Sequence, residues 1–340
     1  MVRKSRIDAP GALHHIIIRG IERRSIFIDS QDYQNFLERL GDILTDSSTP
    51  CYAWALMTNH AHFLLRTGMV PISTVMRRLL TGYAQQFNRR HKRCGVLFQN
   101  RYKSFLCEEE PYLLELVRYI HLNPMRAELV QDLKALRSYP GCGHAVLMGR
   151  CDQNWQDAEY ILKRFGTSVK VARRSYNEFV SKGLSDRRRP DLVGGGGGLL
   201  RSVDGWSALR AIRAAGMRVM GDERILGSSD FVESVLKNAN EEYEKRTRFR
   251  SRGLRLDKII DAASEYFEIK REEIKSPSRR RKISRARAII CMAAIDQAGF
   301  NGADVARALN LTPSAISKLV LRVRNDPALK AVVNDVLDLC

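Results

Sequence analysis

The fold is decided by one stretch of the chain, Met57-Thr58-Asn59-His60-Ala61-His62-Phe63-Leu64-Leu65-Arg66. The stretch is short and alternates, so it predicts a β-strand, in which residues two apart project from the same face. His60 and His62 therefore point the same way. Two imidazoles at a fixed spacing suit a divalent metal ion, but two ligands do not complete its shell. Because many strands also carry such a pair as ordinary packed histidine, further ligands are needed before a metal site is inferred.

A second segment, from Leu113 to Pro124, has the apolar spacing of a helix that ends at or near the proline. Tyr119 and Asn123 are four residues apart on it and share one helix face. Together with the two histidines they would supply three metal ligands and a phenol nucleophile. Tyr112 lies close to two turns before Tyr119 and is the competing nucleophile, but no asparagine follows it by four residues.

These motifs follow Leu13-His14-His15-Ile16-Ile17-Ile18-Arg19-Gly20 and end in Tyr119-Ile120-His121-Leu122-Asn123-Pro124-Met125-Arg126-Ala127. In this order they resemble the single-tyrosine HUH transposases, and within them the REP-associated tyrosine transposases of bacteria. The resemblance spans about the first 130 residues. It implies an enzyme that cuts and rejoins single-stranded DNA beside hairpins of repeated palindromic sequences.

The resemblance also implies a role for each residue. His60 and His62 would hold the metal, with Ala61 where the family has a hydrophobic residue, and Asn123 would be the third ligand. Tyr119 would attack a phosphodiester, giving a 5′-phosphotyrosine intermediate and a free 3′-hydroxyl. A divalent ion would offset the charge that develops at the phosphate, and we expect Mg²⁺ or Mn²⁺.

Three further histidines lie close to these motifs. His14 and His15 are adjacent on the first predicted strand, so at most one of them shares a face with the active site, and we expect both to pack in the strand. His121 follows Tyr119 by two residues and points away from it, so we leave it out of the metal shell.

Composition fits a protein that binds nucleic acid. The 340 residues include 57 lysines plus arginines against 38 acidic residues, a formal net charge of +19, which favours polyanionic partners. We expect a cytoplasmic protein without a membrane partner, because no apolar run is long enough to span a bilayer and the charged N-terminus has no signal core after it. The seven cysteines form no Cys-x-x-Cys pair, so we expect reduced thiols and no zinc site.

The chain predicts three regions: a catalytic domain at 1–145, a helical linker region with a glycine-rich connector at 146–250, and a helix-turn-helix domain at 251–340. Strands and helices intermix in the first without regular alternation, so we expect an α+β fold, an antiparallel sheet packed with helices as in the ferredoxin-like HUH domains. The third is all-α and is similar to the duplex-binding domain of the DnaA-type replication initiator, although the recognition helix starting at Pro313 departs from that signature. The stretch Gly221 to Val232 recurs in such transposases, but no mechanism follows from it.

Basic and polar residues in both end regions are candidates for DNA contacts. In the catalytic domain these are Arg77, Arg78, Arg101 and Lys103. In the C-terminal domain they are Arg279, Arg280, Arg281, Lys282, Arg285, Ser314, Ser317 and Lys318.

The sequence therefore predicts a transposase that takes single-stranded and hairpin DNA in its first domain and duplex DNA in its last. A homodimer is possible, since many insertion-sequence relatives complete one chain's site with the tyrosine of another. Two alternatives stay open: a DNA-binding regulator without catalysis, and an HUH nickase that initiates replication or conjugation. All four site residues are present, which argues against the first, and no helicase domain is visible to support the second.

Overall fold

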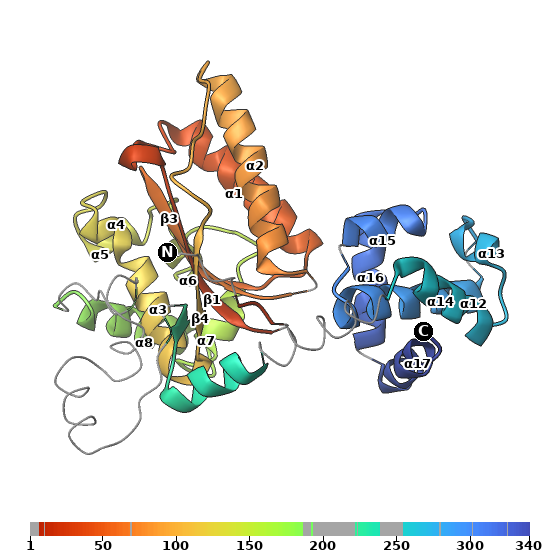
Figure 1. The fold of residues 1–340 in the computed structure, drawn as a ribbon. Coiled ribbons are helices and arrows are strands. Elements are labelled where there is room, and N and C mark those ends of the chain that lie inside the picture. Colours follow the sequence, from red (N-terminus) through yellow and green to blue (C-terminus); the bar gives the residue numbers. More distant parts are fainter. Residues whose placement is uncertain are drawn as a thin grey trace, which may run out of the picture. The chain divides into compact units, whose positions relative to one another are not determined.

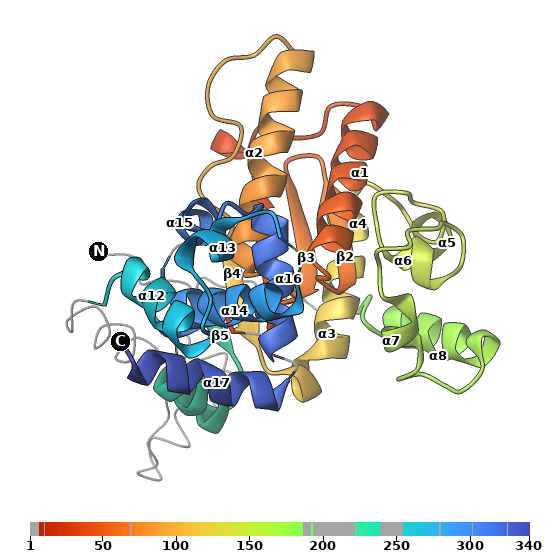
Figure 2. The same cartoon turned by 90° about the vertical axis from the view of Figure 1, so that its right-hand side faces the viewer.

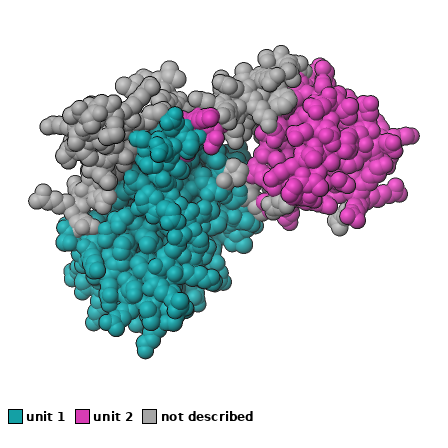
Figure 3. All heavy atoms as spheres, turned by 90° about the horizontal axis from the view of Figure 1, so that it is seen from below, with its two compact units in different colours: residues 1–234 teal, residues 235–340 magenta. Residues whose placement is uncertain are grey.

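A computed structural model describes residues 7–9, 11–68, 70–185, 192, 222, 224–238, 254–278, 280–300, 302–324 and 326–340. The chain divides into two compact units, Met1–Ser234 and Val235–Cys340, which Figure 3 draws in different colours. Among these residues no helix combines the length and hydrophobicity needed to cross a membrane, and the seven cysteines are free thiols.

Unit 1 is built on a five-stranded sheet in the order β2-β3-β1-β4-β5. Its first four strands are β1 (Leu13–Arg19), β2 (Cys51–Met57), β3 (His60–Arg66) and β4 (Lys103–Cys107), and each pairs antiparallel with its neighbours. The predicted strand with the two histidines is therefore confirmed, and it lies inside the sheet. Only Thr58 and Asn59 separate β2 from β3, so these strands form a tight hairpin.

The predicted α+β architecture is confirmed, with one correction to the antiparallel sheet. β5 (Ile225–Leu226) pairs parallel with β4, so the sheet is mixed. This strand comes from the stretch Gly221 to Val232, to which the sequence assigned no role. Glu108, directly after β4, fixes it by accepting a hydrogen bond from the Ser228 backbone N–H at 2.7 Å.

Helices cover both faces of this sheet (Figures 1 and 2). On one face, α1 (Ser30–Asp46) and α2 (Ile72–Arg90) bury a core that includes Phe36, Leu79 and the β3 residue Phe63. On the other face lies α3 (Glu109–His121), whose core includes Leu116 and the β3 residue Leu64. Neighbouring residues of β3, such as Phe63 and Leu64, thus point into opposite cores, because successive side chains of a strand lie on opposite faces.

Further helices continue the second core. They are α4 (Asn123–Arg126), α5 (Leu133–Leu136), α6 (His144–Leu147), α7 (Ala158–Leu162) and α8 (Val169–Lys182), and a 3₁₀ turn, η1, spans Ile21–Arg23. Leu147, Ile161 and Tyr176 are buried together with residues of α3. The boundary predicted at residue 145 therefore does not separate two compact units, because α6 to α8 complete the core of the first. The predicted glycine-rich connector, residues 194–198, lies outside the described residues.

Unit 2 is helical, as predicted. Its elements are α12 (Leu256–Tyr266), α13 (Arg271–Lys275), α14 (Arg281–Met292), a π-helical turn η3 (Ala293–Gln297), α15 (Gly302–Ala308), α16 (Pro313–Arg324) and α17 (Pro327–Asp338). One apolar core joins them, with Ile259, Ile289, Leu309, Val323 and Val336 fully buried. α15 and α16 are separated by a short turn, and their assignment as a DnaA-type helix-turn-helix stays a prediction.

Candidate active site

The strand register places the two histidines against β1. Arg19 is the cross-strand partner of His60, and Ile17 is the partner of His62. Residues of the same parity on β1 therefore share the face of His60 and His62, and His15 is one of them. This face is the one that α3 covers.

His15 is part of the site, which corrects the expectation that it only packs in its strand. Its Nε2 lies 3.0 Å from Nδ1 of His62, and its Nδ1 lies 3.0 Å from the carbonyl oxygen of Leu192. Both imidazoles are buried. The signal was present in the sequence, because only one of His14 and His15 can face His62, but the register that selects His15 comes from strand pairing.

Tyr119 meets both of these rings. Its phenol ring lies edge-on to His62, with ring centroids 5.9 Å apart, and edge-on to His15, at 6.0 Å. The guanidinium of Arg126, from α4, lies over the Tyr119 ring at 5.2 Å from its centroid. α3 and β3, which the sequence predicted to share one site, are therefore in contact through Tyr119 and His62. The sequence analysis did not single out Arg126.

Asn123 is connected to the same tyrosine. α3 ends at His121, and Asn123 opens α4 with Pro124 in its first turn, so the chain turns here much as the proline predicted. The side chain of Asn123 is buried and donates from Nδ2 to the Tyr119 carbonyl oxygen at 3.1 Å. Since the amide nitrogen is used as a donor, the amide oxygen Oδ1 is its available ligand atom.

His60 sits at the start of β3 beside the hairpin turn. Its Nδ1 lies 2.6 Å from Oδ1 of Asn59, and its ring centroid is 5.4 Å from that of His62. For the Nε2 atoms of His60 and His62 the structure gives no hydrogen bond to any described residue.

Burial keeps these histidines neutral. Desolvation lowers the pKa of His60 to about 4, with the nearby Arg19 adding to the effect. Desolvation likewise lowers the pKa of His15 to about 4, against the opposing effect of its hydrogen bond to Leu192. The pKa of His62 falls well below its usual value, first through burial and then through His15, His60 and Arg19. Neutral imidazole is the form that binds a metal ion.

The residues present fit a divalent metal ion in the donors that they offer. Among the described residues, none hydrogen-bonds to Nε2 of His60, to Nε2 of His62 or to the amide oxygen of Asn123. Within the described part of the chain, no three His, Cys, Asp or Glu side chains are grouped to hold a metal ion. A metal here would therefore need the Asn123 amide, and further oxygen ligands from water or DNA.

Basic side chains surround this face of the sheet. Arg19 is exposed and pairs with His60. Lys103 is exposed at the start of β4, where it pairs with Ile17 of β1. Arg101 is exposed just before it. Lys103 and Arg101 were predicted from the sequence as DNA contacts. The sequence analysis missed Arg19. It lies four residues after His15 on β1, so both side chains project from the same face of the strand.

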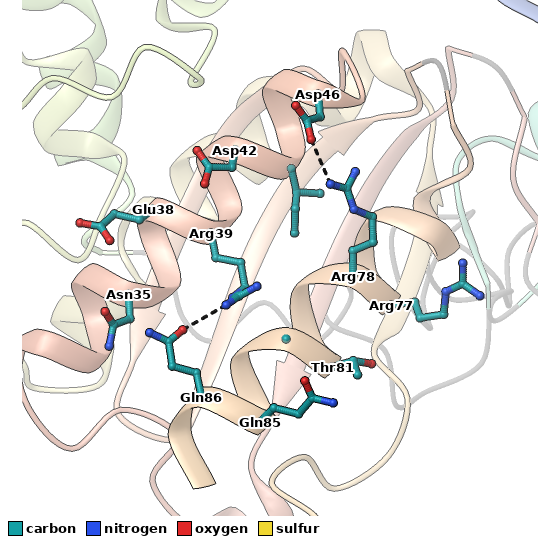
Figure 4. Close-up of a pocket in the computed structure, with 12 residues that line it drawn as sticks. Asn35, Glu38, Arg39, Asp42, Asp46, Arg77, Arg78, Thr81, Gln85 and Gln86 are labelled. Atoms are coloured by element: carbon teal, nitrogen blue, oxygen red, sulfur yellow. Dashed lines mark hydrogen bonds and ion pairs between the residues drawn. The ribbon is translucent and has the colours of Figure 1, made fainter. Parts of the chain in front are cut away.

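Arg77 and Arg78 lie elsewhere. They line an open groove of about 800 Å³ between α1 and α2, on the sheet face opposite to His62 (Figure 4). Arg78 is paired with Asp46 of α1 at 3.0 Å, and Glu38 and Asp42 line the same groove. The structure therefore separates these two arginines from the tyrosine and histidine cluster.

The remaining histidines have other surroundings. His14 faces the other side of the sheet, where Nε2 lies 3.4 Å from Asp8 and Nδ1 lies 3.2 Å from the Ser104 hydroxyl. His121 is buried, with Nδ1 at 2.7 Å from the Tyr176 hydroxyl. His144 contacts the same hydroxyl at 2.8 Å. Tyr112 is half-buried against the core that α3 covers.

The predicted DNA contacts of unit 2 gather on α14, on the loop before it and on α16. Arg280, Arg281, Lys282, Arg285 and Lys318 are exposed. Arg279 lies outside the described residues, as do the side chains of Ser314 and Ser317. Arg287, two residues after Arg285, is instead buried and donates to the carbonyl oxygens of Ile274 and Ser278, both at 2.7 Å, and to that of Ser276.

Comparison with known proteins gives one family match and similar solved structures. Residues 10–123 match the family model described as "Transposase IS200 like". Among solved structures, a REP-associated tyrosine transposase bound to a REP hairpin is 18% identical with a TM-score of 0.37, and the match covers 46% of this chain and 91% of that one. A putative transposase from Deinococcus radiodurans R1 is 20% identical with a TM-score of 0.26, and the match covers 35% of this chain and 95% of that one. No curated protein matches the chain.

Proposed function

We propose that residues 10–123, which match the family model described as "Transposase IS200 like", cleave and rejoin single-stranded DNA beside hairpins through Tyr119. The phenolate oxygen attacks the phosphorus of a scissile phosphodiester. A P–O bond to tyrosine forms, the bond to the 3′-oxygen breaks, and that oxygen leaves as a 3′-hydroxyl. A second 3′-hydroxyl then attacks the phosphotyrosine and releases Tyr119, so no nucleotide cofactor is consumed.

One observation carries the proposal: the edge-on contact between the rings of Tyr119 and His62, at 5.9 Å, beside His60 at 5.4 Å from His62. A phenol with its ordinary pKa near 10 is a poor nucleophile at neutral pH. A divalent metal ion bound by His60, His62 and Asn123 would supply positive charge to a nonbridging oxygen of the phosphate. Mn²⁺ and Mg²⁺ are the candidates, because both take oxygen ligands, and the two imidazoles favour Mn²⁺ or a similar metal.

The chain's own residues do the remaining work. Burial of the Tyr119 ring against His15 and His62 limits the orientations that the nucleophile can take. Arg126 places a positive charge over the ring of the nucleophile. Arg19, Arg101 and Lys103 are exposed beside the same sheet face and would bind the phosphates that flank the scissile bond.

Unit 2 would hold duplex DNA. The exposed cations on or near α14 and α16 include Arg280, Arg281, Lys282, Arg285 and Lys318. Phosphate contacts from such side chains anchor a helix-turn-helix on a duplex, and the N-terminal part of its second helix reads base edges. Ser314, Ser317 and Lys318 occupy that part of α16.

The test is the covalent adduct. The full chain is incubated with end-labelled single strands that carry imperfect palindromes, with Mn²⁺, with Mg²⁺ or with chelator, and the products are separated under denaturing conditions. We expect a labelled protein band that needs the metal. Tyr119→Phe should abolish the band and leave DNA binding intact, whereas the matched variant Tyr112→Phe, two turns away on α3, should keep it.

The outcomes separate the assignments. An adduct that survives in Tyr119→Phe and disappears in Tyr112→Phe would transfer the nucleophile role to Tyr112. An adduct that forms equally well in chelator would remove the metal from the mechanism. No adduct with any palindromic strand, while binding persists, would favour a DNA-binding regulator.

A further inference from the structure

We propose that two backbone carbonyl groups, those of Arg23 and Leu192, fix which nitrogen of His60 and His62 carries the proton, acting through Asn59 and His15. Each relay leaves the Nε2 lone pair of its histidine free for a ligand. Asn59 and His15 are then positioning residues of the proposed metal site. This inference rests on the proposed function, and it adds residues that neither the sequence motifs nor the family match assigns.

The first relay begins at the Arg23 carbonyl. This oxygen can only accept, so the Asn59 side chain must direct its Nδ2 toward it, at 3.0 Å. The orientation of the amide is thereby settled, and Oδ1 of Asn59 faces Nδ1 of His60 at 2.6 Å. An amide oxygen cannot donate, so Nδ1 of His60 carries the hydrogen. Its Nε2 is therefore unprotonated.

The second relay begins at the Leu192 carbonyl and follows the same logic. Nδ1 of His15 lies 3.0 Å from this oxygen and must donate to it. In a neutral imidazole the other nitrogen, Nε2, is then an acceptor. It lies 3.0 Å from Nδ1 of His62, which must donate, so Nε2 of His62 is also unprotonated. The burial of both rings favours their neutral forms over an imidazolium.

The Arg23 carbonyl belongs to the 3₁₀ turn η1, in which the Arg23 N–H donates to the Gly20 carbonyl oxygen at 3.1 Å. Glu22 and Arg23 adopt φ angles of 51° and 61° in this turn, which non-glycine residues rarely take. The Leu192 side chain is buried in the core that α3 covers.

The relays matter because a histidine protonated at Nε2 presents a hydrogen where a metal ligand needs a lone pair. Partners that fix the tautomer of a ligating histidine typically change metal affinity about 10- to 100-fold when they are removed. Both relays end in neutral groups, so the charge of a bound ion stays available to a phosphate.

The first test uses the metal-free full chain. Protein labelled with ¹⁵N at histidine is examined in chelator by long-range ¹H–¹⁵N correlation, with His60→Gln and His62→Gln spectra for assignment. We expect both histidines to carry the proton on Nδ1 and to show an unprotonated Nε2. A proton on Nε2 of either ring would overturn its relay, and this readout is independent of whether the protein cleaves DNA.

The second test measures Mn²⁺ affinity by electron paramagnetic resonance in two variants of one position. His15→Phe fills the space of the ring without an acceptor, and we expect Mn²⁺ binding to weaken about 10- to 100-fold. His15→Gln places an amide oxygen and an amide N–H near the positions of Nε2 and Nδ1, and we expect it to restore most of the affinity. Equal affinity in all three proteins, or equal loss in both variants, would overturn the positioning role.

Asn59 gives an independent arm, because its hydrogen bonds lie in the exposed hairpin turn rather than in the core. Asn59→Leu should weaken Mn²⁺ binding and shift the His60 tautomer toward Nε2–H, with the His62 signals unchanged. A shift at both rings would show a general disturbance of the hairpin and would contradict two separate relays. Absence of Mn²⁺ binding in the unaltered chain would refute the proposed metal chemistry, while the tautomer measurement would still decide the relays.

Discussion

The Arg126 guanidinium stacks over the ring of Tyr119, 5.2 Å from its centroid. Arg126 belongs to α4, which begins only after α3 has ended, so the arginine reaches back across the junction to the nucleophile. The break between α3 and α4 thus brings the Asn123 amide to the Tyr119 carbonyl oxygen and the Arg126 guanidinium to the Tyr119 ring. In a continuous helix, Arg126 would instead lie about two turns beyond Tyr119 along the same axis, because it is seven residues farther on.

Removing this cation should slow the chemical step. Arg126→Gln keeps a polar side chain but loses the charge over the ring, and we expect the rate of adduct formation in a single turnover to fall about two- to fivefold, as the loss of an exposed cation–π contact worth about 0.5–1 kcal/mol predicts. Arg126→Lys should retain part of the rate.

Lys134→Gln is the control for Arg126, because it removes one exposed charge from α5 in the same unit. If Lys134→Gln slows adduct formation as much as Arg126→Gln does, net charge explains the effect and the ring contact does not.

Single-stranded DNA binding should depend on the sheet face that carries His62. We expect Arg19→Gln and Lys103→Gln each to weaken binding and to reduce the slope of log K against log salt by roughly 0.7, the value for one phosphate contact on a single strand. Fluorescence anisotropy of a labelled strand at several salt concentrations measures both quantities.

Arg77→Gln provides the comparison from the opposite face. Arg77 lines the groove with Glu38, Asp42 and Asp46, whose charge disfavours a phosphate backbone, so its effect on the slope should be smaller. A reduction equal to that of Arg19→Gln would extend the DNA surface across α2.

The sequence predicted the strand and the helix that form the site, but not the contacts of His15 and Leu192 that hold its histidines. The period of two in β3 and the spacing of Tyr119 and Asn123 are local patterns, and local patterns are readable from one sequence. The contact of His15 with His62 depends on the register between two strands, and the Leu192 carbonyl arrives from a distant segment. Neither leaves a periodic signal. The parallel strand β5 was missed for the same reason, since a two-residue strand has no period.

Stability should fall in mild acid, and His144 allows the effect to be isolated. Burial lowers the pKa of His144 to about 4, below the ordinary value near 6.5 of the unfolded chain. Below about pH 6.5, His144 is protonated in the unfolded state but stays neutral in the folded state. The free energy of unfolding therefore decreases as the pH falls. The loss stops once the pH passes below the folded pKa. In this window the slope is roughly 1 kcal/mol per pH unit for one such histidine.

His144→Asn removes the titrating ring and keeps a group that can bond the Tyr176 hydroxyl. We expect the stability advantage of the unaltered chain over this variant to shrink from about pH 6.5 to about pH 4.5 and to be constant above that range. Urea unfolding followed by tryptophan fluorescence measures it for unit 1, because the three tryptophans all precede residue 235. Parallel curves for the two proteins across this range would contradict the assigned direction.

Two arginines of α14 should behave oppositely. Arg287 is buried and donates to three carbonyl oxygens between α13 and α14, so Arg287→Ala leaves these acceptors unsatisfied and should destabilise unit 2 by about 2–4 kcal/mol. Arg285 is exposed two residues earlier. Arg285→Ala should leave thermal unfolding within about 0.5 kcal/mol and weaken duplex binding, because it removes a phosphate contact without disturbing the core.

Calorimetry of the full chain and anisotropy with a labelled duplex separate these two effects, and Lys330→Ala, an exposed lysine of α17, is the matched control for charge. We expect the control to reduce duplex affinity less than Arg285→Ala does. If Arg285→Ala and Lys330→Ala weaken duplex binding equally, the attraction comes from the net charge of unit 2, and α14 and α16 do not form a specific DNA-binding surface. If Arg287→Ala unfolds no earlier than Arg285→Ala, the buried guanidinium does not hold the loop that leads into α14.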